Sequence, residues 1–473
     1  MIPLALRRIA EITGGELLDP AVGDLVVDGP VVTDSREAGP GSLYVARVGE
    51  HADGHVYIPS ATSNGAVAAL VTRPVEDIPA VLVADVQDAF AALAREVVRL
   101  GVESGMRVVG ITGSSGKTST KDLLAHVLEA HGETVATIGS LNSEVGVPLT
   151  LCRVTPTTRM LVVEMGARGI GHVDYLTSMA PPHVGVVLNV GTAHLGEFGS
   201  REAIAMAKSE LVQALPADGL AVLNADDELV RAMAQVTPAR VCLTGRADDA
   251  QVRATDVALD VLGAPSFTLH VPDGDAGRRT LPVALTLLGE HHVDNALAVV
   301  AVALELGMTP ESVVDRLQSA APASRWRMER HVREDGVVIV NDAYNANPDS
   351  MSAALRTLAR MEAAGRRVAV LGAMYELGPE STDEHRRMGT LAADLGIDTV
   401  LAVGADAAAI ADGAAHGAGD SGRPEVHHVD TLDAAEALLS GILVDGDVVL
   451  LKSSRDAGLR LLGDALLAQE VRS

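Results

Sequence analysis

From residue 107 onward, short apolar runs alternate with stretches whose apolar residues recur at helical spacing. The runs are VVGI, LVVEM, VGVVLNV and LAVLN, and residues 123–128 illustrate the helical spacing between them. Consecutive parallel strands need a helical crossover, so this alternation predicts an α/β fold built on a parallel sheet. The alternation returns after residue 326 with VVIVND, RRVAVLG, TVLAVG and DVVLLKSS, and it predicts a second sheet of the same kind.

Two stretches depart from this alternation. Residues 1–104 mix short strand-like runs with turn signals such as Pro40-Gly41, which predicts a small domain. Residues 250–290 alternate apolar and polar positions in VALDVL, FTLHV and PVALTL, as antiparallel strands do. We therefore predict three domains: a small N-terminal α/β domain over residues 1–104, a central parallel-sheet domain with an antiparallel extension over residues 105–324, and a C-terminal Rossmann-like domain over residues 325–473.

The composition argues against several classes of protein. There are 37 Lys and Arg against 63 Asp and Glu, a net charge of −26, which disfavours broad binding to nucleic acid or to an anionic membrane. Two cysteines, Cys152 and Cys242, are too few for a disulfide framework or a thiolate metal site. We find no signal-peptide pattern, and the apolar stretch 296–304 is shorter than the about 20 residues of a membrane span. A soluble cytoplasmic protein is therefore expected.

Residues 108–118, VVGITGSSGKT, run from a predicted strand through a glycine loop into a predicted helix. In that context backbone N–H groups and the helix N-terminus face phosphate oxygens, Lys117 reaches the terminal phosphates and the Thr118 hydroxyl binds Mg²⁺. The strict motif requires glycine five places before Gly116, and Ile111 stands there, so this is a shorter GxxGKT variant. The central domain is accordingly expected to be a P-loop domain that binds ATP.

Only four of the 37 basic residues are lysine: Lys117, Lys121, Lys208 and Lys452. Arginine replaces a solvated lysine freely, but it cannot replace a compact amine that must lose its proton. The remaining lysines are therefore enriched for chemistry, although Lys121 has no evident task.

Two further side chains follow predicted strands of the central sheet. Glu164 ends the run LVVEM, and His194 follows VGVVLNV. Open parallel sheets present ligands at the carboxyl ends of their strands, so Thr118, Glu164 and His194 are candidates to hold a divalent cation. Taken singly, Glu164 is also consistent with a hydrogen-bond acceptor at the end of a strand. His194 is likewise consistent with a loop histidine that has no role in binding. A separate signal is the crowding of Asn341, Asn345 and Asn347, three of eight asparagines, which marks a turn or a site.

Together these motifs resemble the Mur ligase family, ATP-dependent amide-forming enzymes of cell-wall precursor synthesis, over almost the whole chain. The segments that carry the resemblance are TDSREAGPGSLYVA, GITGSSGKTSTKD, NSEVGVPLTL, VVEMGARGIGH, NVGTAHLGEFGS, AKSEL, NDAYNANPDSM and LGAMYELGPES. The NDAYNANPDS run and the LGxMxELG pattern discriminate best, and the chain lacks the DNPR-like motif of the member that adds diaminopimelate. The resemblance implies a ligase that adds D-alanyl-D-alanine to UDP-N-acetylmuramoyl-tripeptide through an acyl phosphate.

The resemblance also implies roles for single residues. Catalytic roles fall to Lys117, His194, Lys208 and Arg327, with Lys208 carbamylated. Metal ligation falls to Thr118, Glu164, His194 and Lys208. The ATP-binding set is Gly113, Ser114, Ser115, Gly116, Lys117, Thr118, Ser119, Asn295 at the adenine, Arg327 at the γ-phosphate and Asp342 at the ribose. The substrate-binding set is Ser35 and Arg36 at the UDP end, with Asn142, Tyr344, Asn345 and Asn347.

Three positions depart from the family pattern. His292 stands where asparagine is usual, Trp326 where glycine commonly precedes Arg327, and Ser453 where the KGSR motif has glycine. Trp326, the only tryptophan, is expected to pack at the junction of the last two domains.

The implied partners are small molecules only, namely Mg-ATP and the two substrates, and the chain is expected to act as a monomer without nucleic acid or a membrane span. Other functions remain open from the residues alone. They are another ligase of the same superfamily, such as one adding glutamate to folate or a different amino acid, a P-loop kinase, and a regulatory module that hydrolyses ATP slowly.

Overall fold

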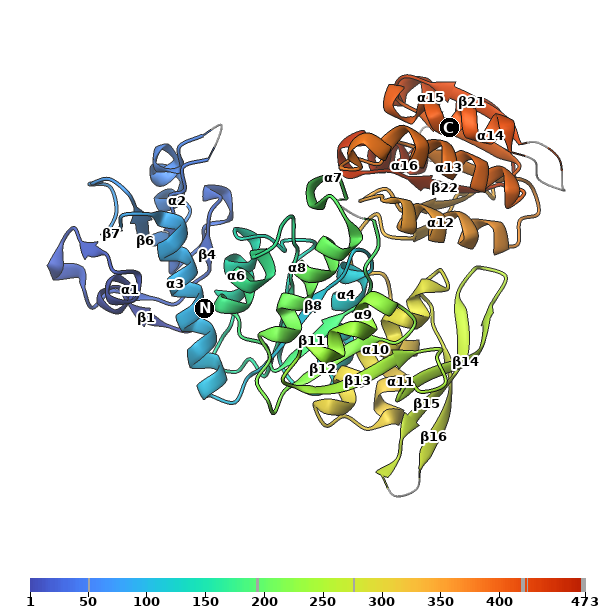
Figure 1. Ribbon diagram of the computed structural model, residues 1–473. Helices are drawn as coiled ribbons and strands as arrows, with labels where there is room; N and C mark the ends of the chain where they lie inside the picture. The colour runs from blue at the N-terminus through green and yellow to red at the C-terminus, as the bar shows by residue number, and fades with distance from the viewer. Residues whose placement is uncertain (50–51, 193–194, 275–276, 418–421, 423, 469–473) are drawn as a thin grey trace.

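The computed structural model describes residues 1–49, 52–192, 195–274, 277–417, 422 and 424–468. Three α/β units follow one another along the chain: the N-terminal unit lies at the left of Figure 1, the central unit in the middle and the C-terminal unit at the upper right. None of the described helices combines the length and the apolar composition needed to cross a bilayer. The predicted fold class is confirmed in each unit.

The N-terminal unit is built on a mixed sheet with the strand order β2-β7-β6-β5-β4, parallel except where β2 meets β7. Its elements are β1 (Leu4–Ala5), α1 (Leu6–Thr13), β2 (Glu16–Leu17), β3 (Val26–Val27), β4 (Val31–Val32), β5 (Ser42–Val45), α2 (Ile58–Ser63), β6 (Ala66–Val71), β7 (Ala80–Leu82) and α3 (Val86–Glu103). Strands β1 and β3 form a separate antiparallel pair.

Helix α3 ties the N-terminal unit to the central unit. Its N-cap Asp85 accepts a hydrogen bond from the Asp88 N–H (2.9 Å), and its side chains Leu93 and Val97 are fully buried. They belong to one apolar cluster that runs without a break from the N-terminal sheet into the central sheet. Separating the two units would expose this core to water, which opposes movement between them.

The central unit contains a nine-stranded sheet with the order β16-β15-β14-β13-β12-β11-β8-β10-β9. Its strands are β8 (Arg107–Thr112), β9 (Thr134–Ala136), β10 (Met160–Glu164), β11 (Val184–Val187), β12 (Leu220–Asn224), β13 (Arg240–Gly245), β14 (Val252–Leu259), β15 (Pro265–Pro272) and β16 (Arg278–Ala284). Its helices are α4 (Lys117–Leu128), α5 (Gly146–Leu151), α6 (His172–Met179), α7 (Leu195–Phe198), α8 (Arg201–Gln213), α9 (Glu228–Ala232), α10 (His291–Glu305) and α11 (Pro310–Gln318).

Strands β8 to β14 pair in parallel with their neighbours in this group. Strand β15 pairs antiparallel with both β14 and β16. The predicted antiparallel extension is therefore confirmed. Strands β10 and β11 are buried along their whole length, which explains why they read as continuous apolar runs.

The C-terminal unit has a six-stranded sheet with the order β17-β18-β22-β19-β20-β21, in which only the edge strand β17 is antiparallel. Its elements are β17 (Glu329–Val332), β18 (Val338–Asn341), α12 (Pro348–Arg360), β19 (Arg367–Leu371), α13 (Ser381–Asp394), β20 (Thr399–Val403), α14 (Ala408–His416), β21 (Glu425–Val429), α15 (Leu432–Ile442), β22 (Val448–Lys452) and α16 (Leu459–Ala468). Two apolar clusters contain strand residues of this sheet together with different helices, as in a doubly wound fold.

Trp326 lies where the chain enters the C-terminal unit, and its described contacts are with that unit, so packing against the central unit stays a prediction. It adopts φ of +60°, a left-handed conformation that explains why glycine is common at this position. Its indole N–H donates to the Asp464 carboxylate (3.1 Å), and its ring stacks on Tyr344 with centroids 6.5 Å apart. These contacts hold a bulky side chain in a backbone conformation that only glycine adopts without strain.

The remaining contacts between the central and C-terminal units are largely polar. Asp349 accepts from the Thr192 N–H (3.0 Å), the Glu362 N–H donates to the Val261 carbonyl (2.9 Å), and Glu290 pairs with Arg360. Among the residues that the structure describes, Ala264 and Leu288 of the central unit join the apolar core of the C-terminal unit near Met361. Two described residues of the central unit thus belong to the C-terminal core, whereas the cluster along α3 is shared by many residues of both units it joins.

Asp447 anchors the start of β22. Its fully buried carboxylate accepts from the Arg366 guanidinium (2.7 Å) and from the Val444 N–H (3.1 Å). Burial raises the pKa of Asp447, but the hydrogen bonds from Arg366 outweigh it and hold the pKa below its usual value. Because the folded-state pKa is depressed, this stabilisation is complete above the unfolded-state pKa and is lost as the pH falls through the folded-state value.

We predict that Asp447→Ala lowers the free energy of unfolding of the C-terminal unit by about 3 kcal/mol at pH 7, since it leaves Arg366 without its buried partner. The loss should begin to shrink below about pH 4, the pKa of the unfolded-state carboxyl, and should vanish once the pH has fallen through the lower folded-state pKa, where the wild-type carboxyl is also neutral. Calorimetry of the full chain measures both effects. Asp445→Ala, at an exposed carboxylate two residues earlier, is the control and should leave the transition within about 0.5 kcal/mol of wild type.

Candidate functional site

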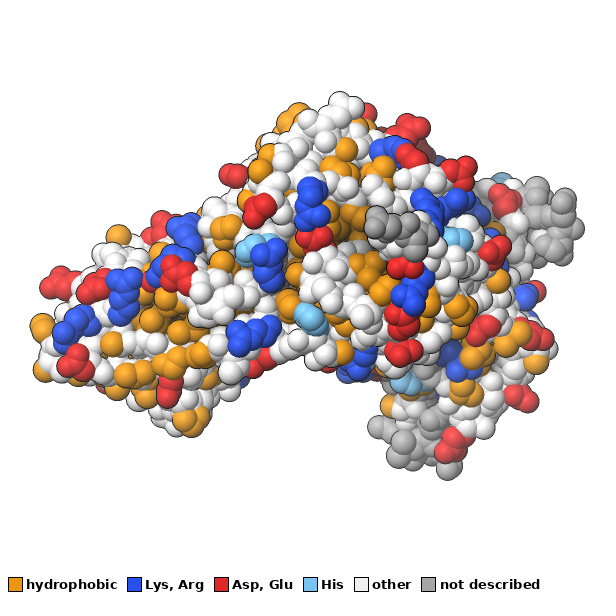
Figure 2. Space-filling view, turned by 90° about the horizontal axis from the view of Figure 1, so that it is seen from below, with side chains coloured by type: hydrophobic (Ala, Val, Ile, Leu, Met, Phe, Trp, Pro, Cys, Tyr) orange, Lys and Arg blue, Asp and Glu red, His pale blue; other side chains and the backbone are white. Residues whose placement is uncertain are grey.

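A cavity of about 1060 Å³ lies between the carboxyl ends of the central strands and the C-terminal unit. Central residues that line it come from the loop before α4, the end of β10 and the first turns of α10. C-terminal residues come from the segment before α12, from α12 itself and from the end of β22. On the face drawn in Figure 2, basic and acidic side chains are interspersed without an extended basic surface. Because the protein carries a net charge of −26, an anionic ligand needs locally placed positive groups.

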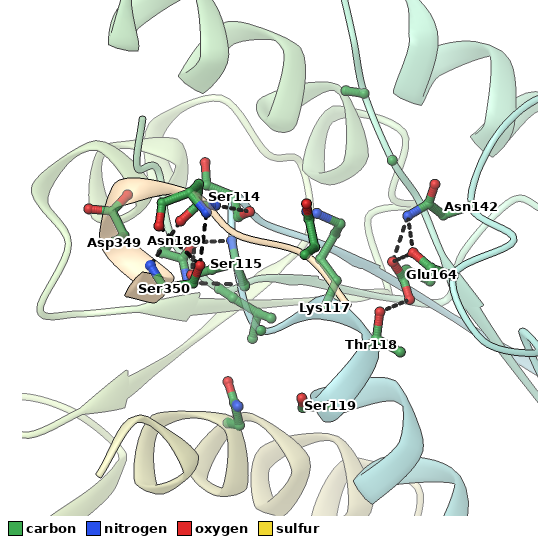
Figure 3. A pocket seen from close by; sticks show the side chains of 18 of the residues that line it. Ser114, Ser115, Lys117, Thr118, Ser119, Asn142, Glu164, Asn189, Asp349 and Ser350 are labelled. Carbon is green, nitrogen blue, oxygen red and sulfur yellow. Dashed lines mark hydrogen bonds between the residues drawn. The ribbon is translucent and has the colours of Figure 1, made fainter. Parts of the chain in front are cut away.

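The glycine loop between β8 and α4 is held by Asn189, which follows β11. The Asn189 carbonyl accepts from the Ser114 N–H (3.1 Å), and its side-chain oxygen accepts from the Ser115 N–H (2.9 Å; Figure 3). Gly116 has φ of +79°, and a Cβ there would lie 2.8 Å from the side-chain oxygen of Asn295. This position therefore requires glycine for its backbone conformation and for the close approach of α10.

Lys117 begins α4, and its ammonium group donates to the Gly113 carbonyl (2.7 Å). Burial lowers the pKa of Lys117; the Glu164 carboxylate opposes this shift and the Arg327 guanidinium adds to it. An anion in the cavity would favour the charged form, which makes a charge-assisted hydrogen bond to phosphate.

Thr118 and Glu164 form the hydrogen-bonded centre of the cavity floor (Figure 3). The Thr118 hydroxyl donates to one carboxylate oxygen of Glu164 (2.8 Å), and the Asn142 amide donates to the other (2.6 Å). Glu164 is buried at the end of β10, and its backbone N–H donates to the Thr137 hydroxyl oxygen (3.1 Å). Hydroxyl and carboxylate oxygens side by side are the donor set that Mg²⁺ prefers, so these residues fit the predicted metal.

His194, the third predicted ligand, lies outside the described residues. Among the residues that are described, no cluster of three His, Cys, Asp or Glu is placed to hold a metal ion. The metal assignment therefore rests here on the oxygens of Thr118 and Glu164.

Lys208 is buried on α8, a helix whose N-cap Ser200 accepts from the Ala203 N–H (3.1 Å). Burial, followed by the nearby positive charge of Lys117, lowers the pKa of Lys208 well below its usual value. This environment favours the neutral amine. It is the protonation state that reaction with carbon dioxide requires.

The first turn of α10 carries four polar residues beside the glycine loop. Asn295 is buried with its amide nitrogen 3.5 Å from a ring nitrogen of His292, and the rings of His291 and His292 lie 4.4 Å apart. Burial, and then His291, lowers the pKa of His292 well below its usual value, so this ring is neutral. Burial raises the pKa of Asp294 to about 6, although Arg246 opposes the shift.

The C-terminal unit supplies cations and a carboxylate to the same cavity. Lys452 donates to the Asp342 carboxylate (2.7 Å) and to the Asn345 carbonyl (2.8 Å), and it is almost fully buried. The Arg327 guanidinium lies 4.4 Å from the ring centroid of Tyr344, and its Nε has no hydrogen-bond partner among the described residues. An unpaired, buried guanidinium nitrogen at a cavity wall fits an anionic ligand.

Asn347 has a local structural task. Its side-chain oxygen accepts from the Ser350 N–H (2.8 Å) as the N-cap of α12, and the Ser350 hydroxyl accepts in return from the Asn347 N–H (3.0 Å). Its amide nitrogen also donates to the Ser114 carbonyl (3.5 Å) of the glycine loop. A role in substrate binding stays a prediction.

Most of the predicted site residues gather around this one cavity. The lining contains Ser114, Ser115, Gly116, Lys117, Thr118, Ser119, Asn142, Glu164, Asn295, Arg327, Asp342, Tyr344, Asn345 and Asn347. Gly113 and Lys208 do not belong to the lining, but Gly113 accepts from Lys117, and the charge of Lys117 lowers the pKa of Lys208.

Ser35 and Arg36 are not part of that lining. They lie in the N-terminal unit, where Arg36 binds Asp34 through its backbone and side chain and thereby lowers the pKa of Asp34 to about 2. Sequence reasoning missed Asp349 and Glu376, which also line the cavity. Arg455 lines it as well; it ends the segment 452–455, whose departure from the KGSR motif left its role open.

The chain matches three descriptions of one family. Residues 30–102 match the catalytic domain of the Mur ligase family, residues 111–303 the Mur ligase middle domain, and residues 326–455 the Mur ligase glutamate ligase domain. The UDP-N-acetylmuramoyl-tripeptide–D-alanyl-D-alanine ligase of Mycobacterium tuberculosis strain H37Rv is 46% identical, with 99% of each chain covered.

Two solved structures extend the likeness to the fold. MurF from Acinetobacter baumannii superposes with a TM-score of 0.86 at 31% identity, covering 98% of this chain and 99% of its own. The MurF ligase from Thermotoga maritima in complex with ADP has a TM-score of 0.79 at 29% identity, covering 93% of this chain and 97% of its own.

We predict that Lys452→Ala weakens nucleotide binding about tenfold and lowers the thermal stability, because it leaves the Asp342 carboxylate unpaired at the cavity wall. Calorimetric titration with Mg-ADP measures the affinity without turnover. Arg387→Ala, at an exposed ion pair on α13, is the control and should change neither quantity. An unchanged affinity for the lysine variant would show that Lys452 does not position the loop before α12.

Proposed function

The chain belongs to the Mur ligase family, and we propose that it joins D-alanyl-D-alanine to UDP-N-acetylmuramoyl-tripeptide with conversion of ATP to ADP and phosphate. The product is the pentapeptide precursor of peptidoglycan. The observation that carries the proposal is the cavity in which the glycine loop, the Thr118–Glu164 pair and the Arg327 guanidinium meet, the Nε of Arg327 having no partner among the described residues. The 46% identity across the whole length of a D-alanyl-D-alanine ligase supports this choice of substrates.

The nucleotide is assigned to groups from both sides of the cavity. The N–H groups of residues 113–119 and the ammonium of Lys117 receive its phosphates, and Arg327 neutralises the γ-phosphate. Asn295 supports the adenine, and Asp342 supports the ribose. Lys117 and Arg327 thus place two positive charges where a protein of net charge −26 would otherwise repel the ligand.

The reaction has two steps. A carboxylate oxygen of the tripeptide attacks the γ-phosphorus, the bond to ADP breaks, and an acyl phosphate forms. The amine of D-alanyl-D-alanine then attacks the acyl carbon, phosphate leaves with the bonding electron pair, and the amine proton is released. Lys117 and Arg327 offset the charge of the transferring group throughout, since phosphoryl transfer depends mainly on positioning and charge neutralisation.

Mg²⁺ is assigned to the Thr118 hydroxyl and the Glu164 carboxylate, which lie 2.8 Å apart, with His194 as a further ligand. When bound, it supplies Lewis-acid neutralisation of phosphate oxygens. Asn142 keeps the Glu164 carboxylate oriented through its 2.6 Å hydrogen bond. Asn142, Tyr344, Asn345 and Asn347 are assigned to the substrates, and Ser35 and Arg36 to their UDP end.

Lys208 is proposed to carry a carbamate. Its neutral amine would attack carbon dioxide, forming an N–C bond and releasing one proton, so that a buried cation becomes a carboxylate-like anion. Burial supports this step because it lowers the pKa of the amine. The product is suited to help hold Mg²⁺ beside Lys117.

The residues assigned to the nucleotide are divided between the central unit and the C-terminal unit. This division supports closure of the C-terminal unit onto the central unit when substrates bind. We also propose that the protein works in the cytoplasm as a monomer and uses small molecules only. Both cysteines are free, and Cys152 is buried, which agrees with a reducing compartment.

The proposal is tested by incubating the protein with Mg-ATP, UDP-N-acetylmuramoyl-tripeptide and D-alanyl-D-alanine. Mass spectrometry should find a product equal to the two substrates less one water, formed in a one-to-one ratio with ADP. A phosphorylated acceptor without an amide would identify a kinase instead. Slow ATP hydrolysis that neither substrate stimulates would identify a regulatory module.

We predict that Lys208→Ala abolishes ligation and that formate or acetate partly restores it, because a small carboxylate can occupy the place of the carbamate. Lys208→Arg is the matched variant: it keeps a cation that cannot be carbamylated and leaves no room for the added acid. Initial rates with and without the acid measure the effect. Full activity of the alanine variant would rule out the carbamate.

A further inference from the structure

The loop after β11 contacts the first turn of α12 across the junction of the two units. The Asp349 carboxylate accepts from the Thr192 N–H (3.0 Å) and from the Thr192 hydroxyl (3.4 Å). Asp349 is the second residue of α12 and lines the main cavity. Figure 3 places it beside Ser114 and Asn189, at the glycine loop.

The same loop also binds the glycine loop. The Gly191 N–H donates to the Ser114 hydroxyl (2.9 Å), and the Ser114 carbonyl accepts from the Asn347 amide (3.5 Å). Asn347 caps α12 two residues before Asp349. Ser114, the segment 191–192 and the start of α12 therefore form a closed ring of hydrogen bonds that spans the two units.

The ring depends on a close approach at Gly191. A Cβ there would lie 2.0 Å from a carboxylate oxygen of Asp349, whereas its distance to the Ser114 Cβ would be an ordinary 3.4 Å. The φ of Gly191 lies outside the left-handed region, so its backbone accepts an alanine. Glycine is needed at this position because of Asp349 and not because of the backbone conformation.

The carboxylate is unexpected at the wall of a cavity that receives phosphates, because like charges repel. Its two hydrogen bonds come instead from the N–H and the hydroxyl of Thr192 in the central unit. The chemistry of Asp349 therefore suits docking between the units better than contact with the nucleotide.

We propose that Asp349 is a positioning residue for the ATP site, which couples the seating of the C-terminal unit to the conformation of the glycine loop through Thr192, Gly191 and Ser114. The coupling is reciprocal: nucleotide that orders the glycine loop strengthens docking, and docking strengthens nucleotide binding. This inference rests on the proposed function for its ligand, Mg-ATP.

Three single variants and one double variant test the coupling. Asp349→Ala removes the acceptor and should weaken Mg-ADP binding about 5- to 10-fold, whereas Asp349→Asn keeps an acceptor oxygen and should stay within about twofold of wild type. Gly191→Ala should weaken binding at least as much as Asp349→Ala, because the added methyl group meets the carboxylate. The double variant Gly191→Ala/Asp349→Ala should bind more tightly than Gly191→Ala alone, since the clash is gone.

The measurements are calorimetric titration with Mg-ADP and the KM for ATP in the ligation assay. Gly441→Ala is the control, because a Cβ at that glycine of α15 meets open space. The coupling would be overturned if the Gly191 and Asp349 losses multiply without recovery in the double variant, or if Asp349→Asn is as defective as Asp349→Ala. Thermal scans confirm that each variant is folded.

The outcome is independent of the choice of substrates. If the wild type forms no ligated product but the single and double variants show the expected affinities for Mg-ADP, the proposed function fails and the coupling stands. If ligation proceeds and the variants bind Mg-ADP as wild type does, the function stands and the coupling fails.

Discussion

The division of the nucleotide-binding cavity between two units, held together mainly by polar contacts, is the constraint on which the rest of the structure depends. The seam along α3 buries a continuous apolar core and keeps the N-terminal and central units together. The junction with the C-terminal unit depends instead on hydrogen bonds and ion pairs such as Asp349 with Thr192 and Glu290 with Arg360. Polar contacts exchange with water at little net cost, so this is the junction that can open.

Burial of lysine gives the cavity its electrostatic character. Lys117 and Lys208 lie close enough for the charge of one to lower the pKa of the other, and burial lowers both. An acidic protein thereby keeps cationic groups whose charge depends on what binds beside them. Lys452 is different: it is paired with Asp342 and holds a loop rather than a ligand.

The sequence predicted most of the fold because its signals are local. A parallel strand buried on both faces must be apolar throughout, as β10 and β11 are, and an antiparallel pair with one wet face must alternate, as β14 to β16 do. The glycine loop was also predictable, since Gly116 needs a left-handed φ at the start of α4. The scarcity of lysine singled out four residues, of which Lys117 and Lys452 line the cavity, Lys208 is buried near Lys117, and Lys121 is buried and pairs with Asp122.

Contacts between distant segments could not be predicted in this way. Asp349 and Thr192 are 157 residues apart, and nothing in either local pattern indicates that they meet. Asn347 carries two tasks, the cap of α12 and the contact with Ser114, and only the first has a sequence signature. The sequence by itself determined the elements, the glycine loop and the residue types of the chemistry, because these follow from periodicity and backbone conformation. Tertiary structure alone decided which side chains share the cavity and how tightly Gly191 meets Asp349, because those distances depend on how whole units pack.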